Sequence, residues 1–427
     1  MSKYKESVFN IKIKDQDKWI IYNTFTGAMI RLDSKLSRVM CHDEQAKLLA
    51  DQGFILDSVI DEINELEINR KFGIYNLRPE VIHFSIAPTL KCQAKCPYCF
   101  EQDLQYKRDI TFLTAQHVVS YIEDVLKRTN AKELRVNFFG GEPLLAKEKI
   151  LYIGSKLKEY CEKKNIKMNS RLVTNGILLD RNAANLLIRD ANIKYVQITL
   201  DGMEQIYNKV KGIKAFNTVI SNIMAICEKV RVIIRLNVLP NNREDILKLG
   251  RYLLIDCDLR NKIEIYLAPV KSDYGCGISE DQCCSEEMFS EFETLFLDTY
   301  GKYLKNKVVL PTRKQRACAF ENVVNGCIGP EGEIYQCEKV FGRSEYIIGD
   351  VVKGKYRSER ELDFFQDLDE KCKTKECPLL PICYSGCPME RKSLTSPVNC
   401  DALMAKMSTA ILRTVNRIDA NSKGIEV

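Results

Sequence analysis

The chain has 427 residues, which is too long for one ordinary domain and fits a large catalytic domain with one or two smaller ones. Its net charge of +6 comes from 64 basic and 58 acidic residues interleaved along the chain, so it offers no basic stripe for nucleic acid, although a peptide or acidic partner is compatible. The start lacks a hydrophobic signal region and no window approaches about 18 uninterrupted apolar residues, so we expect a cytoplasmic protein outside the membrane.

The 18 cysteines are expected to be metal ligands, catalytic groups or buried apolar residues, because disulfides rarely persist in a reducing compartment. Three of them lie close together between Cys92 and Cys99, and a larger group begins at Cys318. Scattered cysteines such as Cys161 and Cys227 fall in amphipathic segments and are expected to be core residues.

Residues 1–78 are predicted to form a small α+β module. Apolar residues alternate in residues 8–15 and 19–33, and the turn signal at Thr26-Gly27 indicates a β-hairpin. Two following segments, residues 34–40 and 57–72, have a helical period.

Residues 79–270 alternate short apolar runs with amphipathic segments, which is typical of repeated β-α units. The strands are predicted at residues 81–88, 133–141, 170–176, 195–202, 230–239 and 263–270. The helices are predicted at residues 114–128, 147–163, 180–190, 215–229 and 242–254. Six such units predict an α/β fold with a parallel sheet curled into a partial (β/α)6 TIM-type barrel.

The loop after the first predicted strand reads CQAKCPYCF and places Cys92, Cys96 and Cys99 in a C-x3-C-x2-C spacing. In a barrel of this kind, ligands bind where strands end and loops begin. Three thiolates can converge on one metal group, whereas a structural zinc site would need a fourth ligand. The three histidines of the chain offer no obvious one. A [4Fe-4S] cluster held by three cysteines would keep one iron open for another molecule.

With Tyr98 before the last cysteine and Phe100 after it, this loop resembles the signature of the radical S-adenosylmethionine (SAM) enzymes. The resemblance implies that SAM chelates the open iron and is cleaved by one electron from the cluster. The resulting 5′-deoxyadenosyl radical then takes a hydrogen atom from a substrate. Tyr98 and Phe100 would flank the cluster and the adenine, and ordinary loop packing is the alternative for Phe100.

The second predicted strand ends in NFFGGEP, which resembles the Gly-Gly-Glu-Pro motif of the same family. Gly140 and Gly141 permit a close approach of the backbone, and Pro143 stiffens the exit from the strand. Glu142 would face the ammonium group of SAM. The motif therefore predicts the binding site for the methionyl end of SAM.

Two later strand ends supply Asn175 and Thr199, where family members often contact the ribose or carboxylate of SAM. The family often has serine at the position of Thr199, and the helix that follows carries Lys211 rather than the family's arginine. Asp201 has two interpretations: a catalytic group that faces the substrate, or a turn residue that caps this helix.

Residues 271–310 are predicted to be a linker or helical bridge, and residues 311–427 a cysteine-rich domain ordered by bound metal, because periodicity fades and Gly, Pro and Cys punctuate loops. The latter segment resembles the SPASM extension of radical SAM enzymes. The matching positions are Cys318, Gly332, Cys337, Cys377, Cys383, Cys387 and Cys400. Cys372 departs from the pattern, since four residues rather than two separate it from Cys377.

The interleaved ligation of that family implies two auxiliary [4Fe-4S] clusters. The outer cluster would be held by Cys372, Cys377, Cys383 and Cys400. The inner cluster would be held by Cys318, Cys337 and Cys387, with Cys327 as the nearest candidate for the fourth ligand and Cys276, Cys283 and Cys284 next. An inner cluster without a fourth cysteine could bind a substrate thiolate. One or two zinc knuckles are the alternative for these cysteines.

The resemblance narrows the substrate to peptides and proteins. We expect a radical SAM oxidoreductase that abstracts a hydrogen from a ribosomally made precursor peptide and installs a crosslink, first a thioether and next a carbon-carbon bond. Residues 1–78 would bind a leader strand at the hairpin edge, or would cap the barrel, and flavodoxin or ferredoxin would donate electrons. The alternatives are an anaerobic sulfatase-maturing enzyme that forms formylglycine and a non-catalytic iron-sulfur electron carrier.

Overall fold

The computed structural model describes residues 3–39, 43–104, 106–272, 276–304, 310–355, 364–365, 367–392 and 400–422. The chain forms two compact units, each combining segments that are distant in the sequence. The first unit consists of Met1–Asn76, Val308–Asn322 and Leu362–Val427. The second unit consists of Leu77–Lys307 and Val323–Glu361. The domain boundaries expected from the sequence stay predictions. Within the described residues, no helix has both the length and the apolar character needed to span a bilayer.

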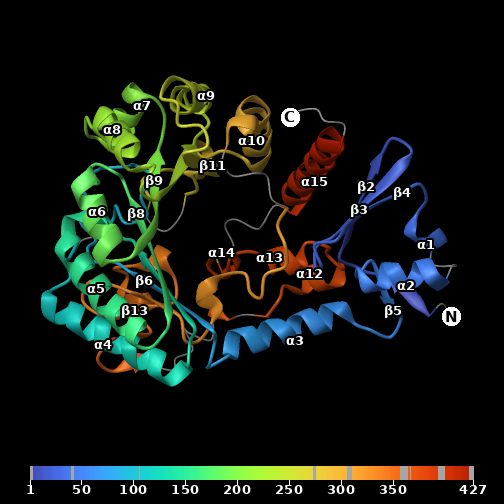
Figure 1. Cartoon of the computed structure of the whole chain (residues 1–427), viewed down its shortest axis with the longest axis horizontal. Helices are drawn as coiled ribbons and strands as arrows, with labels where there is room; N and C mark the ends of the chain where they lie inside the picture. Colours follow the sequence, from blue (N-terminus) through green and yellow to red (C-terminus); the bar gives the residue numbers. More distant parts are fainter. Residues whose placement is uncertain are drawn as a thin grey trace. The chain divides into compact units, whose positions relative to one another are not determined.

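Six parallel strands form the centre of the second unit, and each pairs with its neighbour in the sequence. They are β6 (Val81–Ile86), β7 (Glu133–Phe138), β8 (Lys167–Thr174), β9 (Ile193–Leu200), β10 (Arg231–Val238) and β11 (Ile263–Pro269). The connecting helices are α4 (Phe112–Thr129), α5 (Lys147–Lys163), α6 (Arg181–Asp190), α7 (Glu204–Lys211), α8 (Phe216–Ile226) and α9 (Arg243–Arg251). Figure 1 shows α4, α5, α6 and α8 on the outer side of these strands. The predicted α/β fold with a partial barrel is confirmed.

Apolar and polar residues alternate along these strands, so one face of the sheet is apolar and the other is largely polar. Val196, Ile198, Val232 and Ile234 are buried in one core with the apolar faces of the helices. Because successive side chains of a strand point to opposite faces, the alternate residues face away from this core, toward the barrel interior. Those positions are largely polar, which makes the interior suitable for a hydrophilic ligand.

The sheet continues beyond β6 into strands that the sequence did not predict. They are β12 (Gly326–Ile328), β13 (Glu333–Tyr335), β14 (Gly349–Asp350) and β15 (Gly354–Lys355). β12 pairs in parallel with β6, with Cys327 opposite Ser85, and the other three pair antiparallel in turn. Strands of two or three residues contain too little alternation to be recognised in a sequence.

The first unit contains a three-stranded antiparallel sheet in the order β2-β3-β4. These strands are β2 (Asn10–Asp15), β3 (Lys18–Asn23) and β4 (Met29–Leu32), so the predicted hairpin at Thr26-Gly27 is confirmed. A separate pair joins β1 (Tyr4–Glu6) to β5 (Ile55–Asp57). The helices of this part are α1 (Leu36–Val39), α2 (Asp43–Asp51) and α3 (Glu62–Tyr75).

Both faces of β3 are buried within this unit. Ile20 and Tyr22 lie in a cluster with Met407 and Ile411 of the C-terminal helix α15 (Cys400–Ser422). On the other face, Ile21 packs with residues of α1 and α2. Within the described residues, the unit also contains the short helices α12 (Glu370–Thr374), α13 (Leu380–Cys383) and α14 (Pro388–Lys392).

A fully buried ion pair connects α3 to the segment that carries Cys318. The Arg70 guanidinium lies 2.7 Å from the Glu321 carboxylate, and both side chains are 0% exposed. The second oxygen of Glu321 accepts a hydrogen bond from the backbone N–H of Ala317 at 2.8 Å and a longer one from Cys318 at 3.4 Å. This carboxylate therefore positions the backbone of a predicted cluster ligand.

Replacing Arg70 with methionine should destabilise the first unit by about 3–5 kcal/mol, because it leaves the Glu321 charge buried without its guanidinium. The shift of the urea unfolding midpoint measures this. Arg260→Met is the control, since the Arg260–Asp258 pair is exposed and should contribute at most about 1 kcal/mol. Equal stability of the two variants would contradict this account.

Candidate functional site

The loop that follows β6 carries Cys92, Cys96 and Cys99, which are all partly buried free thiols. The backbone N–H of Cys99 donates to the carbonyl of Cys96 at 3.1 Å, and the Asn175 side-chain amide lies 3.9 Å from the Cys92 sulfur. Burial raises the pKa of Cys92 to about 11 and that of Cys99 to about 12. These thiols therefore release protons when they bind iron, and the three-thiol donor set fits a [4Fe-4S] cluster with one open iron.

Gly140 and Gly141 lie against the backbone that leads into this loop. A Cβ atom on Gly141 would stand 2.3 Å from the carbonyl oxygen of Lys91, and one on Gly140 would stand 2.6 Å from that of Thr89. The backbone N–H groups of Gly141 and Glu142 donate to the same two carbonyls, at 3.1 and 2.8 Å. The two glycines thus join the end of β7 to the cysteine loop.

Glu142 connects the end of β8 to the end of β7, next to the cysteine loop. Its fully buried carboxylate accepts hydrogen bonds from the Thr174 hydroxyl at 2.7 Å and from the backbone N–H groups of Asn175 at 2.8 Å and Leu144 at 3.0 Å. Burial raises the pKa of Glu142, and these three donors oppose that shift. Pro143 begins the 3-10 turn η1 (Pro143–Ala146) directly after it. The contact of Glu142 with the ammonium of SAM stays a prediction.

A buried network holds Tyr98 of the cysteine loop. Lys211, at the end of α7, lies 2.9 Å from the Asp201 carboxylate, and both side chains are almost completely buried. The Tyr98 hydroxyl donates to Asp201 and accepts from Lys211 at 3.3 Å. The Lys211 carbonyl also accepts from the backbone N–H of Lys95 at 2.8 Å. Burial lowers and the Asp201 charge raises the pKa of Lys211, with the net shift well upward, so this amine stays charged.

Asp201 does not cap α7. The backbone N–H of Met203 at the start of that helix donates to Asp245, whereas the Asp201 side chain also accepts from Asn237 at 3.2 Å. The interpretation of Asp201 as a helix cap is therefore wrong, because its carboxylate pairs with the buried Lys211 instead of the first N–H groups of α7. The catalytic role of Asp201 stays a prediction, and sequence analysis missed Lys211 as its partner.

The remaining predicted SAM contacts lie around the same strand ends. The Phe100 ring stacks on Phe139, with centroids 6.2 Å apart and an interplanar angle of 10°. Thr199 is half-buried near the end of β9, opposite Arg235 in the register. Asn175 links the Glu142 carboxylate to the Cys92 sulfur. Their contacts with SAM stay predictions.

The structure brings the four predicted ligands of the outer auxiliary cluster together within the first unit. After burial, the negative charges of Cys372, Cys377 and Cys400 help to raise the pKa of Cys383 to about 11. Cys372 likewise raises the pKa of Cys377 and Cys400. The backbone N–H of Cys377 also donates to the carbonyl of Cys372 at 3.1 Å. The assignment of these four cysteines to one cluster stays a prediction.

The predicted ligands of the inner cluster are distributed over both units. Cys318 and Cys387 belong to the first unit, and Cys337 and Cys327 to the second. Cys327 is fully buried in β12. Its role as fourth ligand stays a prediction.

The loop that carries Cys276 lies beside the cysteine loop, which the sequence did not indicate. The backbone N–H of Gly277 donates to the carbonyl of Pro97 at 2.8 Å. Cys283 and Cys284 follow near the start of α10 (Glu286–Tyr300). Among the described residues, no three His, Cys, Asp or Glu side chains are grouped closely enough to bind a single metal ion.

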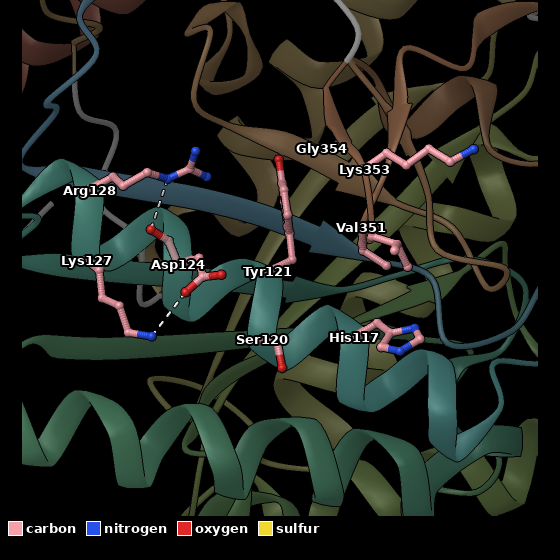
Figure 2. Close-up of a pocket in the computed structure, with 10 residues that line it drawn as sticks. His117, Ser120, Tyr121, Asp124, Lys127, Arg128, Val351, Lys353 and Gly354 are labelled. Carbon is pink, nitrogen blue, oxygen red and sulfur yellow. Dashed lines mark hydrogen bonds and ion pairs between the residues drawn. The ribbon is translucent and has the colours of Figure 1, made fainter.

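A pocket of about 550 Å³ lies elsewhere on the second unit, between α4 and the turn that joins β14 to β15 (Figure 2). On its α4 side, Lys127 forms an ion pair with Asp124 at 3.0 Å, and Arg128 donates to the Asp124 carbonyl at 3.2 Å. None of its lining residues is a predicted site residue, so we assign no chemistry to it.

Residues 86–253, which contain the cysteine loop, the GGEP turn and Asp201, match the family model of the Radical SAM superfamily. Residues 86–253 thus form a radical SAM domain. The chain is 26% identical over 275 residues to the radical SAM cyclopropyl synthase TigE of Paramaledivibacter caminithermalis, covering 52% of the chain and 57% of TigE. It is 31% identical over 120 residues to the cysteine-type anaerobic sulfatase-maturating enzyme of Clostridium perfringens, covering 27% of the chain and 32% of that enzyme. The matched part of the chain thus spans a little more than half of TigE and about a third of the sulfatase-maturating enzyme.

Two solved structures of SuiB from Streptococcus suis share the fold. With S-adenosylmethionine bound, SuiB has a TM-score of 0.56 and 16% identity, covering 92% of this chain and 97% of SuiB. Bound to the precursor peptide SuiA, it has a TM-score of 0.55 and 15% identity, covering 92% and 98%. The expected radical SAM domain with its [4Fe-4S] and SAM cofactors is confirmed for residues 86–253, whereas the assignment of individual cysteines to clusters stays a prediction.

Gly141→Ala should destabilise the second unit by about 1–3 kcal/mol, because its Cβ would overlap the backbone of Leu90 and Lys91. The urea midpoint of the anaerobic apoprotein measures this. Gly301→Ala is the matched control, since a Cβ there meets no atom within 4 Å. Unchanged stability of Gly141→Ala would show that this close approach is absent.

Lys211→Met should cost about 3–5 kcal/mol, because the Asp201 carboxylate would remain buried without its cation. The Asp201→Asn, Lys211→Met double variant should recover part of this loss, since neither charge remains. Urea midpoints of the single and double variants give the coupling. Additive effects of the two substitutions would be inconsistent with a buried ion pair.

Proposed function

We propose that this protein is a radical SAM peptide maturase that oxidatively crosslinks a ribosomally made precursor peptide, with a thioether as the first choice of bond and a carbon-carbon bond as the second. The observation that carries this proposal is the cysteine loop, whose three thiols lie among strand ends fixed by Glu142 and by Tyr98, Asp201 and Lys211. The proposal includes cytoplasmic action with flavodoxin or ferredoxin as electron donor.

The protein's own residues hold the reactants in place. Cys92, Cys96 and Cys99 would hold a [4Fe-4S] cluster that, when bound, supplies an electron to cleave SAM into a hydrogen-abstracting 5′-deoxyadenosyl radical. Asn175 and Thr199 stand at neighbouring strand ends, where they can orient SAM.

A peptide substrate is supported by the fold shared with SuiB, whose structure was solved with the precursor peptide SuiA. In the first unit, β4 pairs with β3 on one side and forms an edge of the three-stranded sheet. An extended leader peptide could add to this edge through backbone hydrogen bonds, with alternate side chains giving specificity. We therefore propose that the leader adds to β4, which is one of the two edge strands of this sheet.

Formylglycine formation in a sulfatase is the second candidate. It is supported by 31% identity to the Clostridium perfringens sulfatase-maturating enzyme, over 120 residues. That reaction would use the same cysteine loop, so the two candidates differ in the substrate and not in the SAM chemistry.

Dithionite-reduced, reconstituted protein should release 5′-deoxyadenosine from SAM, and the Cys92→Ala, Cys96→Ala, Cys99→Ala variant should show only the rate of a protein-free control. Liquid chromatography of the nucleoside products measures this. Cys227→Ala is the control, because Cys227 lies at the end of α8 and is not a predicted ligand. Wild-type protein without 5′-deoxyadenosine release would exclude a radical SAM reaction and leave the electron-carrier alternative.

The modified peptide should lose two hydrogen atoms, since a crosslink forms one bond at the expense of two bonds to hydrogen. Mass spectrometry of a precursor peptide encoded beside the gene, and of a sulfatase-derived cysteine peptide, separates the two candidates. Formylglycine formation would replace sulfur by oxygen in addition to the loss of two hydrogens. That mass change in the sulfatase peptide, with an unmodified precursor, would overturn the maturase proposal.

A further inference from the structure

Part of the cysteine loop lies at the molecular surface. Lys95 and Pro97, the residues on either side of Cys96, are exposed, and Cys96 itself is only partly buried. A protein that docks on Lys95 and Pro97 would therefore stand beside a predicted ligand of the SAM cluster.

The end of α7 lies against this exposed part of the loop. The backbone N–H of Lys95 donates to the Lys211 carbonyl at 2.8 Å. Gly212 is the C-cap of α7, and a Cβ atom on it would stand 3.3 Å from the Cβ of Lys95 and 4.0 Å from its Cδ. The Lys95 side chain therefore runs along this glycine, and the loop and the end of α7 share one surface.

Three lysines of this surface have no carboxylate partner. Residues 89–97 and 205–217 contain five lysines and no aspartate or glutamate. Two of the five are neutralised, since Lys91 and Lys211 form ion pairs at 2.6 and 2.9 Å with carboxylates from outside both segments. The other three are exposed, and none forms an ion pair with a carboxylate among the residues that the structure describes. They are Lys95, Lys209 and Lys214, which we call the basic patch.

The chain keeps the three lysines of the basic patch close together. Lys95 lies against Gly212, and Lys214 and Lys209 stand two and three residues from that glycine. Since an extended chain advances at most about 3.6 Å per residue, their Cα atoms lie within about 7 and 11 Å of the glycine Cα. The Debye length is about 8 Å at physiological ionic strength. An anionic surface docked here would therefore interact with all three charges.

We infer that the basic patch is the docking surface for a small electron-donor protein whose own redox centre is surrounded by acidic side chains. This inference rests on the proposed radical SAM function and locates the delivery of its electron. The reduced donor gives up one electron to the cluster predicted at Cys92, Cys96 and Cys99, and no atom is transferred. Charge complementarity suits this partner, because redox encounters have small interfaces and depend on electrostatic steering.

The position of the basic patch favours an electron donor over an acidic substrate peptide. Electron transfer weakens steeply with distance, so the donor must dock beside the cluster ligands, and Lys95 lies between two of them in the sequence. The leader peptide is proposed at β4 of the first unit, and it needs no anion-binding surface on the cysteine loop.

An oxidised plant-type [2Fe-2S] ferredoxin, which is an acidic protein, is the probe for this surface. It should bind the reconstituted holoprotein at low ionic strength, with an affinity that falls steeply with salt, because the contact joins exposed charges. The Lys209→Glu, Lys214→Glu variant should bind it about tenfold more weakly in isothermal titration calorimetry. Lys95 is left unchanged in this variant because it belongs to the cysteine loop.

The matched control is Lys194→Glu, Lys229→Glu. It reverses two exposed lysines that lie at the start of β9 and just before β10, at the opposite ends of these strands from the cysteine loop. This control should keep the affinity of the wild-type protein. Absence of ferredoxin binding to the wild-type protein, unchanged affinity in the Lys209→Glu, Lys214→Glu variant, or an equal loss in the control would overturn the inference.

Electron delivery is measured in the same proteins without SAM. Stopped-flow absorbance follows the bleaching of the clusters by reduced ferredoxin, and the phase that is missing from the Cys92→Ala, Cys96→Ala, Cys99→Ala variant belongs to the SAM cluster. This phase should slow about tenfold in the Lys209→Glu, Lys214→Glu variant, and the difference should disappear at about 0.5 M salt. Reduction by dithionite corrects for differences in cluster loading. An unchanged rate with ferredoxin would contradict the assignment.

Loss of precursor-peptide binding in the Lys209→Glu, Lys214→Glu variant, with ferredoxin binding unchanged, would assign the basic patch to the substrate instead. None of these measurements requires SAM cleavage. Failure of the proposed function would therefore be seen separately, in the 5′-deoxyadenosine assay.

Discussion

The buried ion pair between Asp201 and Lys211 is the contact on which the geometry of the site depends. It joins the end of β9 to the end of α7, and its carboxylate also receives the Tyr98 hydroxyl from the cysteine loop. Breaking a buried ion pair leaves an uncompensated charge, so conformations of the cysteine loop that separate Asp201 from Lys211 are much higher in energy. The cysteine loop is therefore fixed by electrostatics as well as by its close contact with Gly140 and Gly141.

The barrel could be predicted from the sequence because each of its strands and helices is long enough to show its own period. The cysteine loop and the GGEP turn could be found because their spacing is local. The partnership of Lys211 with Asp201 could not, since it depends on how the end of α7 meets the end of β9 in space. β12 to β15 are too short for a recognisable pattern.

Binding of an auxiliary cluster would be coupled to the folding of the first unit. Cys377 and Cys383 pack against the cluster formed by Ile11, Ile20 and Tyr22, so two predicted ligands border the core of the three-stranded sheet. Glu321, buried against Arg70, positions the backbone at Cys318. Loss of an auxiliary cluster would thus loosen the sheet whose β4 edge we propose as the leader site.

The central claim is that Cys92, Cys96 and Cys99 hold one cluster while the C-terminal cysteines hold two more. Iron counting after anaerobic reconstitution tests it most directly. Wild-type protein should bind roughly twelve irons per chain, and the variant with all three of these cysteines replaced by alanine about four fewer. Equal iron content in the two proteins, or a wild-type value near four, would contradict the account.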